Sequence, residues 1–348
     1  MREALSLAVL GWGQTSPNPL VGAVVIADGV KIGEGYHATF GGPHAEVVAL
    51  DSSGARATGS TLYVTLEPCN HQGRTPPCVD TIIAAGVSRV VIATQDPNPV
   101  AAGGASRLRS AGIQVDVGIL EDEARELNAA FLHSFTSERP WVTLKLAMSL
   151  DGAIAGPRRR RERLTNELSN AVVQRLRAGS DGIAVGVETA IADDPALTAR
   201  SDPPPRIFPV RIVFDRSARL PTDSRLAATA REFGTVIVSS STTPFPMRLA
   251  ELGVDVLTAR DLADALRKLR QRGIVSLLVE GGAGLAASFL AARFVDRMIV
   301  FHTPVLLGDG ALRGFSGVAT QDTAHAPRFR IVQSQRLGND LMTTYAAE

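Results

Sequence analysis

Short apolar runs rich in β-branched residues alternate along this chain with stretches whose apolar residues recur at helical spacing. In the first part of the chain the alternation occupies residues 20–27, 44–51, 61–67, 78–86, 89–96, 105–115 and 121–135. Such a rhythm is typical of an α/β sandwich with a largely parallel sheet. The pattern therefore predicts the α/β fold class for this part of the chain.

A polar segment, Thr136–Pro140, interrupts the pattern before an apolar strand restarts at Trp141. Because domain boundaries fall in polar, proline-containing segments, we predict two domains, residues 1–138 and 139–348. Strands and helices alternate again in the second part, over residues 141–149, 170–179, 181–187, 210–215, 235–240, 261–273, 276–282, 285–292 and 297–306. The second domain is therefore also predicted to be α/β.

Composition narrows the possible partners. The 348 residues include 36 basic and 35 acidic side chains, so the formal charge of +1 offers no general attraction for nucleic acid or an anionic membrane. No apolar stretch approaches the roughly 20 residues that span a bilayer. We therefore expect a soluble, cytoplasmic protein with no nucleic-acid or membrane partner, although a small anionic substrate remains possible. The chain has two cysteines, and without a secretory signal a metal or catalytic role is favoured over a disulfide.

A candidate metal site follows from four residues. His44 and Glu46 come directly after Pro43 at the predicted start of a helix, and Cys69 and Cys78 each follow a proline. The positive end of a helix lowers the pKa of a thiol, which favours the thiolate that binds metal. His44, Cys69 and Cys78 would give Zn²⁺ three ligands and leave the fourth position for water. Zinc lowers the pKa of such a water to about 7, and Glu46 can carry its proton to a leaving amine.

The spacing of these residues separates classes of deaminase. His-x-Glu followed by Pro-Cys and a second Cys is the signature of zinc deaminases, in which two residues normally separate the cysteines. Here eight residues separate Cys69 from Cys78, unlike the nucleoside and nucleic-acid deaminases. His71 lies between them, but three ligands and a water already complete a tetrahedral site, so we do not expect it to bind the metal.

The segment "PCNHQGRTPPC" resembles that of the bifunctional deaminase/reductase of riboflavin biosynthesis. The segments "TSPNPLVGAVV", "GEGYH", "GGPHAEVVAL", "YVTLEPC" and "TQDPNP" resemble the same family in the same order. The resemblance covers nearly the whole chain. It implies a cytidine-deaminase-like α/β/α sandwich followed by a dihydrofolate-reductase-like α/β domain. The implied reactions are zinc-dependent deamination of 2,5-diamino-6-(5-phosphoribosylamino)pyrimidin-4(3H)-one and NADPH-dependent reduction of its ribosyl group to ribityl.

The resemblance also implies roles for residues of the first domain. Asn18 and His37 would hold the pyrimidine or the ribose, and Arg74 and Thr75 would hold the phosphate. An asparagine offers both a donor and an acceptor to a pyrimidine edge, and an arginine binds phosphate oxygens in a fork. Asn18 also lies between two prolines, so a simple turn residue is the alternative interpretation.

In the second domain the resemblance implies three groups of residues. They are the catalytic Lys145 and Glu280, the substrate-binding Arg177, Asp194, Leu197 and Arg200, and the cofactor-binding Ser149, Asp151, Thr165, Gly186, Gly281 and Gly282. "SLLVEGGAG" is typical of a strand, a glycine turn and a helix start that approach a pyrophosphate, although such turns also serve packing alone. A lysine at position 145 of an apolar strand is costly unless it has a partner, and Glu280 is the candidate.

One segment departs from the family. "PRRRRERLTNELSNA" replaces a segment that usually contains a tryptophan, and Arg163 takes the tryptophan position. The run Arg158–Arg161 is either a solvated loop or a means of attracting the phosphate of the cofactor or substrate. An active deaminase with an impaired or cofactor-shifted reductase is therefore one alternative function.

The residues disfavour two other functions. A nucleoside or nucleic-acid deaminase with a C-terminal binding domain is disfavoured by the cysteine spacing, the balanced charge and an aromatic content of 5%. A zinc-stabilised scaffold is disfavoured because structural zinc sites usually have four protein ligands, and this motif supplies three. The family resemblance further suggests a homo-oligomer and NADPH in preference to NADH.

Overall fold

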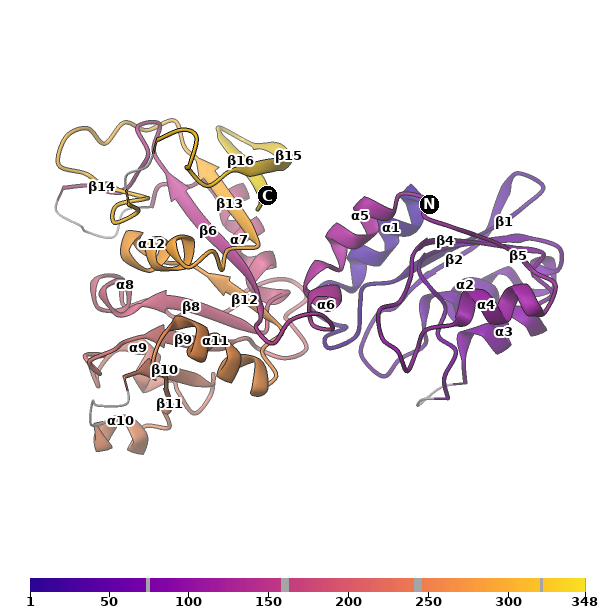
Figure 1. Cartoon of the computed structure of the whole chain (residues 1–348), viewed down its shortest axis with the longest axis horizontal. Coiled ribbons are helices and arrows are strands. Elements are labelled where there is room, and N and C mark those ends of the chain that lie inside the picture. Colours follow the sequence, from indigo (N-terminus) through magenta and orange to yellow (C-terminus); the bar gives the residue numbers. More distant parts are fainter. Residues whose placement is uncertain (73–75, 158–162, 241–245, 320–321, 348) are drawn as a thin grey trace. The chain divides into compact units, whose positions relative to one another are not determined.

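The structure is a computed structural model, and it describes residues 1–72, 76–157, 163–240, 246–319 and 322–347. The chain divides into two compact units, Met1–Ser137 and Glu138–Glu348, which Figure 1 shows in indigo to magenta and in magenta to yellow. The boundary expected from the sequence, after residue 138, lies one residue from this division. No helix among the described residues is both long and apolar enough to cross a membrane.

The N-terminal unit is built on a mixed sheet with the strand order β2-β1-β3-β4-β5. Its strands are β1 (Gly22–Ala27), β2 (Val30–Tyr36), β3 (Thr61–Leu66), β4 (Arg89–Thr94) and β5 (Gln114–Val117). β3, β4 and β5 are parallel, as expected, but β1 runs antiparallel to both β2 and β3. The expectation of a largely parallel sheet was wrong for the pairings of β1, which runs opposite to the other four strands because Asp28 and Gly29 close a hairpin to β2 with φ angles of 51° and 77°.

Helices cover both faces of this sheet. They are α1 (Arg2–Ala8), α2 (Ala45–Ser53), α3 (Cys78–Ala84), α4 (Gly104–Ser110), α5 (Glu121–Leu127) and α6 (Ala129–His133). Figure 1 shows α2, α3 and α4 on one face and α1 and α5 on the other, which confirms the α/β/α sandwich. The start of α2 packs closely on β2, since a Cβ on Gly35 would lie 2.7 Å from the carbonyl oxygen of Ala45. This close packing fixes the start of α2 against the sheet.

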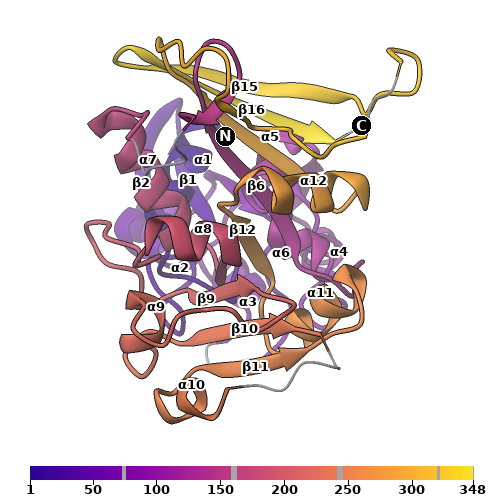
Figure 2. The ribbon, with the colours of Figure 1, turned by 90° about the vertical axis from the view of Figure 1, so that its left-hand side faces the viewer.

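The C-terminal unit contains, among the described residues, a nine-stranded sheet with the order β11-β10-β9-β8-β12-β6-β13-β16-β15. The strands are β6 (Trp141–Met148), β8 (Gly182–Gly186), β9 (Val210–Phe214), β10 (Thr235–Ser239), β11 (Asp255–Thr258), β12 (Ser276–Val279), β13 (Arg297–His302), β15 (Phe329–Leu337) and β16 (Asp340–Ala347). The first seven strands in this order are parallel to one another. β16 pairs antiparallel with β13, and β15 pairs antiparallel with β16 at the edge of the sheet. β7 (Ala153–Ala155) pairs separately with β14 (Leu312–Arg313). Figure 2 shows the β15–β16 hairpin at one end of the unit and β9, β10 and β11 at the other.

Helices also cover both faces of the larger sheet. They are α7 (Glu167–Ala178), α8 (Val187–Asp193), α9 (Arg225–Ala228), α10 (Met247–Glu251), α11 (Leu262–Gln271) and α12 (Ala283–Ala291). Neighbouring residues of a strand point to opposite faces. Accordingly Ile212 of β9 packs in one buried cluster with Leu266 of α11 and Phe289 of α12, and Val213 packs in another with α8, α9 and α10. The second α/β domain expected from the sequence is confirmed.

The central strand β6 shows how the pattern places a charged residue. Its side chains alternate strictly between fully buried and half-buried positions along the strand. Val142, Leu144 and Leu146 belong to the buried set, and Lys145 belongs to the half-buried set. The alternation therefore puts Lys145 on the face opposite the apolar cluster that contains Leu144.

Candidate metal centre and reductase cavity

The three expected metal ligands come together in the N-terminal unit. His44 is the N-cap of α2, with extended φ and ψ of −76° and 158°, and Cys78 is the first residue of α3. Cys69 follows the end of β3 and lies 9% exposed. Pro43 was expected in the first helical turn, but it precedes the N-cap because His44 is extended. The helix start nevertheless brings His44 toward both cysteines.

The distances among these ligands fit a tetrahedral zinc ion. His44 Nδ1 lies 3.1 Å from Cys78 Sγ and 3.6 Å from Cys69 Sγ, and the three atoms lie within 4.8 Å of one another. With bonds of about 2.0–2.3 Å, the ligand atoms of a tetrahedral zinc lie roughly 3.4–3.8 Å apart. His71 is outside this group, in agreement with the argument from the sequence. The donor set and its spacing therefore fit zinc.

Hydrogen bonds favour the thiolate form of Cys69. A hydrogen bond from the Cys78 thiol, helped by His44, lowers the pKa of Cys69 to about 4 against the opposing effect of burial. The same hydrogen bond, together with burial, raises the pKa of Cys78. The backbone N–H of Cys78 also donates to Cys69 Sγ at 3.3 Å. Cys69 is therefore a ready anionic ligand.

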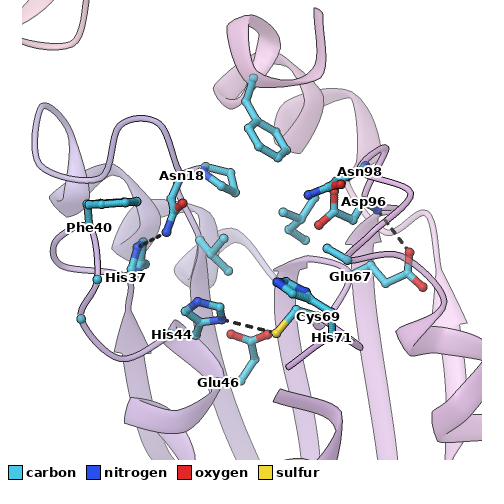
Figure 3. Close-up of a pocket in the computed structure, with 17 residues that line it drawn as sticks. Asn18, His37, Phe40, His44, Glu46, Glu67, Cys69, His71, Asp96 and Asn98 are labelled. Atoms are coloured by element: carbon cyan, nitrogen blue, oxygen red, sulfur yellow. Dashed lines mark hydrogen bonds between the residues drawn. The ribbon is translucent and has the colours of Figure 1, made fainter. Parts of the chain in front are cut away.

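Glu46 lies beside the ligand group but does not belong to it. Its side chain is 3% exposed, and Figure 3 shows it pointing toward His44 and Cys69 at the floor of the pocket. Burial raises the pKa of Glu46, while the charge of His44 acts in the opposite direction. A carboxyl group with a raised pKa takes up a proton more readily than an ordinary one, which suits a residue that accepts a proton and passes it on in general acid and base catalysis.

A cavity of about 320 Å³ opens above these residues, and Asn18 and His37 form part of its wall. His37 Nδ1 donates to the carbonyl oxygen of Pro43 at 3.0 Å, so Nε2 accepts from Asn18 Nδ2 at 3.1 Å (Figure 3). Burial lowers the pKa of His37, which favours this neutral form. Asn18 also forms a turn, through its N–H to Thr15, but its side chain reaches the cavity. Asn18 is therefore a turn residue whose side chain also lines the cavity, and its role in holding the substrate stays a prediction.

Three polar residues near this cavity were not singled out from the sequence. Asp96 and Asn98 line it just beyond β4, and the side chain of Asp96 accepts from the N–H of Asn98 at 2.9 Å. Glu67 accepts from the N–H groups of Asp96 and Ala105 and so supports this loop (Figure 3). Their position directly after predicted parallel strands could have identified them, because ligand-binding sites in α/β folds lie at the carboxyl ends of such strands. Arg74 and Thr75, expected to bind phosphate, lie outside the described residues.

A second cavity, of about 860 Å³, lies in the C-terminal unit at the carboxyl ends of β8, β9, β10 and β12. Gly186, Gly281 and Gly282 line it, at the starts of α8 and α12. A Cβ on Gly282 would lie 2.9 Å from Thr189 Oγ1, which accepts the N–H of Gly282 at 3.1 Å. Glycine at this turn lets a ligand approach the backbone at a helix start, and the position at the strand ends is that of dinucleotide sites. The cavity therefore fits a nicotinamide cofactor.

The charged residues of this cavity are paired differently from the expectation. Arg177 Nε and Nη2 donate to the two oxygens of Glu280 at 2.6 and 2.8 Å, and Arg177 Nη1 donates to the carbonyl oxygen of Thr198 at 3.1 Å. Glu280 was expected to pair with Lys145, but within the described part of the chain no carboxylate lies within 4.0 Å of Lys145 Nζ. Burial lowers the pKa of Lys145, and the charge of Glu280 partly opposes this. All three side chains line the cavity.

The loop after α8 places two neighbouring aspartates differently. Asp193 lines the cavity, whereas Asp194, the residue named from the sequence, is not part of the cavity wall, and its substrate-binding role stays a prediction. The side chain of Asp194 accepts from the N–H of Arg225 at 2.7 Å, at the start of α9. Leu197 is buried and lines the cavity, and Arg200 is exposed and does not. The positive φ of Asp194, 37°, reverses the chain between neighbouring residues, which the sequence pattern did not reveal.

Three of the expected cofactor-binding residues lie outside the cavity wall. Ser149 Oγ donates to Asp151 Oδ1 at 2.7 Å, and the same carboxylate accepts from the N–H groups of Leu307 and Gly308. This hydrogen bond from Ser149 lowers the pKa of Asp151 to about 2. Thr165 precedes α7 and does not line the cavity either. The cofactor role of these residues stays a prediction, as does that of Arg158–Arg161, which lies outside the described residues.

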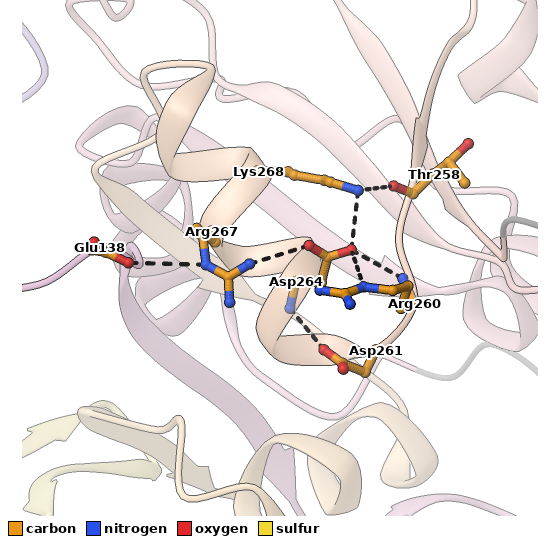
Figure 4. Close-up of polar contacts among 7 residues, drawn as sticks. All are labelled: Glu138, Thr258, Arg260, Asp261, Asp264, Arg267 and Lys268. Carbon is orange, nitrogen blue, oxygen red and sulfur yellow. Dashed lines mark hydrogen bonds and ion pairs between the residues drawn. The ribbon is translucent and has the colours of Figure 1, made fainter.

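Basic residues lie at the far end of the cavity, beyond β9 and β11. Arg216 and Arg260 line it there, and Figure 4 shows how the start of α11 is held. The buried carboxylate of Asp264 accepts from Lys268 Nζ at 3.0 Å, from Arg267 Nη1 at 3.3 Å and from the N–H of Arg260 at 3.1 Å. These contacts fix the backbone that carries Arg260, whose own side chain lies 3.6 Å from the Asp264 carboxylate, and Asp261 lines this end of the cavity beside it.

Breaking the pair of Arg177 and Glu280 is expected to destabilise the C-terminal unit. Arg177→Met leaves a carboxylate that is only 11% exposed without its bidentate partner, and removing one member of a buried pair typically costs about 3–5 kcal/mol. Denaturant unfolding should show this loss, while Arg175→Met, on the exposed side of the same helix, serves as the control. Equal unfolding midpoints for the two variants would contradict the assignment.

The same pair predicts a pH dependence. Burial by itself raises the pKa of Glu280, but the charge and hydrogen bonds of Arg177 outweigh it and hold the pKa below the ordinary value of 4.5. A depressed carboxyl pKa stabilises the fold above the ordinary value, and this contribution is lost as the pH falls through the folded-state pKa. In wild type, the contribution of the Glu280 charge to stability should therefore be lost only in acid, below about pH 4.5. In Arg177→Met, where burial alone raises the pKa of Glu280, the carboxyl group takes up its proton at higher pH, so the stability difference between the two proteins should shrink as the pH falls.

The two sites, carried on one chain, define a bifunctional enzyme with a zinc-binding deaminase domain and a reductase domain. A model of the cytidine and deoxycytidylate deaminase zinc-binding region matches residues 1–94, and a model of the RibD C-terminal domain matches residues 140–343. The chain belongs to the RibD family of riboflavin biosynthesis proteins. The membership confirms the family that the sequence motifs indicated.

Individual relatives match over almost the whole chain. Riboflavin biosynthesis protein RibD of Aquifex aeolicus is 44% identical, over 98% of this chain and 96% of its own. The solved structure of Acinetobacter baumannii RibD is 38% identical, with a TM-score of 0.85 over 100% of this chain and 97% of its own. That of a diaminohydroxyphosphoribosylaminopyrimidine deaminase/5-amino-6-(5-phosphoribosylamino)uracil reductase from Thermotoga maritima is 36% identical, with a TM-score of 0.87 and the same coverage. The nucleic-acid deaminase and the zinc scaffold are therefore not favoured.

Proposed function

We propose that the N-terminal unit removes the 2-amino group of 2,5-diamino-6-(5-phosphoribosylamino)pyrimidin-4(3H)-one, and that the C-terminal unit reduces the ribosyl group of the product with NADPH. The observation that carries the proposal is the group of His44, Cys69 and Cys78, with buried Glu46 beside it, at the floor of a cavity. The name of the Thermotoga maritima relative states these two activities for that protein, which supports the same pair here.

In the deaminase site, His44, Cys69 and Cys78 would hold Zn²⁺, which supplies a water whose pKa is lowered to about 7. Glu46 accepts one proton from this water and delivers it to the amino nitrogen. The oxygen takes the place of nitrogen on the ring carbon, and the nitrogen leaves as ammonia. The raised pKa of Glu46 lets its carboxyl group hold the proton between the two transfers.

The substrate ring would lie against Asn18 and His37. One N–H of the Asn18 amide is used by His37 Nε2, which leaves its carbonyl oxygen and second N–H for the ring edge. Because burial lowers the pKa of His37 and favours its neutral form, His37 orients Asn18 without adding charge to the cavity. Together the two residues present an uncharged donor and acceptor pair, which suits a pyrimidinone.

In the reductase site, bound NADPH supplies the hydride. The glycine turn at Gly281 and Gly282 lies where a pyrophosphate would meet the start of α12, and Arg216 and Arg260 favour the extra phosphate of NADPH over NADH. As C1′ gains the hydride and its bond to the ring oxygen breaks, Lys145 gives that oxygen a proton. The lowered pKa of Lys145 makes its ammonium a better proton donor.

The remaining residues would bind the substrate sugar. Glu280, fixed by Arg177, presents a rigid carboxylate to the sugar hydroxyls, and Leu197 covers the apolar side. The phosphate-binding roles of Arg74, Thr75 and Arg200 stay predictions. So do the homo-oligomeric state and the cytoplasmic location expected from the sequence.

The direct test combines zinc-loaded protein, the diaminopyrimidinone substrate and NADPH in one reaction. Ammonia release and NADPH oxidation are followed together. We expect both, with oxidation lagging behind ammonia release. Ammonia release without oxidation would contradict the proposed reductase function, and oxidation without ammonia release would contradict the proposed order.

A further inference from the structure

One wall of the deaminase cavity is held by a side chain 108 residues further along the chain. Asn128 Oδ1 accepts the N–H of Leu20 at 2.8 Å, and Asn128 Nδ2 donates to the carbonyl oxygen of Leu20, also at 2.8 Å. Both bonds are buried, and Asn128 is only 4% exposed. The amide thus pairs with both backbone groups of a single residue, as a neighbouring strand would.

Asn128 is itself rigidly placed between two short helices. It follows the end of α5 and precedes α6. Its own N–H donates to the carbonyl oxygen of Ala124, and its carbonyl oxygen accepts from the N–H of Leu132 at 2.9 Å. Because its backbone is held on both sides, the side-chain amide presents its donor and acceptor to Leu20 from a fixed position.

The position of Leu20 determines that of Asn18, two residues earlier. Beyond Leu20, the carbonyl oxygen of Val21 accepts the N–H of His37 at 2.9 Å, and the His37 ring accepts from the Asn18 side chain. The segment 18–21 is therefore fixed to His37 at both ends and to Asn128 in the middle. Since His37 also bonds to Pro43, the residue before His44, these contacts tie Asn18 to the metal-ligand group.

The helix that follows Asn128 contributes to the cavity directly. Phe131 of α6, three residues after Asn128, lines the cavity together with Asn18. Figure 3 shows Asn18 on the opposite side of the cavity from Asn98. The junction of α5 and α6 thus both lines the cavity and anchors the segment that carries Asn18.

We propose that Asn128 is a positioning residue for deamination, which acts through Leu20 to hold the Asn18 amide against the substrate ring. The inference rests on the proposed function, in which Asn18 binds that ring. Asn128→Ala leaves both backbone groups of Leu20 without their partner, so the segment is free to shift. If Asn18 binds the ground state and the transition state alike, its displacement raises KM and leaves kcat largely unchanged.

The first experiment measures ammonia release by Asn128→Ala. We expect KM to rise about tenfold, with kcat changed by less than about twofold. Zinc content and NADPH oxidation with pre-deaminated substrate should match wild type, because the second reaction takes place in the other unit. Glu123→Ala, an exposed change on α5, is the matched control. A KM equal to that of the control would overturn the inference.

A double-mutant cycle distinguishes positioning from general destabilisation. Asn18→Ala alone should raise KM, and adding Asn128→Ala should raise it by less than about a further twofold, because both changes remove the same interaction. Independent, multiplying effects would overturn the inference. If Asn128→Ala fails to retain zinc, Asn128→Asp decides the question, since it keeps the acceptor for the Leu20 N–H but replaces the donor with an oxygen that faces the Leu20 carbonyl oxygen. A raised KM with zinc retained supports the inference, and an unchanged KM overturns it. Wild-type protein that releases no ammonia would instead contradict the proposed function.

Discussion

Glu46→Gln is expected to stop deamination while leaving zinc binding and reduction intact. Glutamine has nearly the same shape but cannot accept a proton from water and pass it to the leaving nitrogen. Proton transfer by a positioned side chain typically contributes about 10²–10⁴-fold, so ammonia release should fall by at least this range. Zinc should stay, because Glu46 lies beside the ligand group formed by His44, Cys69 and Cys78 and is not part of it.

The measurement compares three quantities in the same preparation of Glu46→Gln. They are ammonia release, zinc content and NADPH oxidation with pre-deaminated substrate. Asp51→Asn, an exposed change on the same helix, is the control and should behave as wild type. Undiminished deamination would remove Glu46 from the mechanism, and loss of zinc would show that its role is structural.

Cys78→Ser is expected to lose the metal and to destabilise the N-terminal unit. Cys78 is 1% exposed and begins α3, so the substitution removes a ligand and buries a hydroxyl group in its place. Metal binding and folding are coupled because a preformed site rarely exists in the unfolded chain. We expect no ammonia release and a midpoint of unfolding of this unit lowered by about 5–10 °C, equivalent to roughly 2 kcal/mol.

Chelation provides the control for this variant. Removing the metal from wild type should lower the unfolding midpoint of the N-terminal unit, whereas chelator should have no effect on Cys78→Ser. The midpoint of the C-terminal unit should be the same in all samples. Full zinc occupancy in Cys78→Ser would contradict its assignment as a ligand.

The metal centre could be predicted because each of its residues is marked locally in the sequence. Proline precedes His44, Cys69 and Cys78, and helix starts were expected at two of these points. Glu46 comes two residues after the first ligand. What the sequence could not supply was the exact start of α2, because an extended N-cap residue and a first helical residue give the same apolar pattern.

The reductase cavity was less predictable because its contacts join distant residues. Arg177 and Glu280 are separated by 103 positions, and their pairing depends on how α7 packs beside the end of β12. From the sequence, Glu280 was the candidate partner of Lys145, and the pairing of Glu280 with Arg177 of α7 had no local signal. Asp193 and Asp194 are neighbours of the same type, so only the backbone angle at Asp194 decides which one reaches the cavity.

Two hairpins were also missed, although each had a sequence signal. Asp28-Gly29 closes β1 and β2, and Gly338 with Asn339 closes β15 and β16. Dipeptides of this kind favour two-residue hairpin turns. The alternation of strands and helices along the chain favoured parallel strands throughout. It therefore predicted the parallel strands of both sheets but not the two antiparallel hairpins, β1–β2 and β15–β16.

In the proposed function, the two units perform successive reactions on one substrate. The most direct measurement is mass analysis of the products formed with and without NADPH. Without NADPH, the substrate should be converted to a product in which one amino group is replaced by oxygen, and adding NADPH should then add two hydrogens to that product. Hydrogens added to substrate that keeps its amino group, or no change in mass before NADPH is added, would contradict the account.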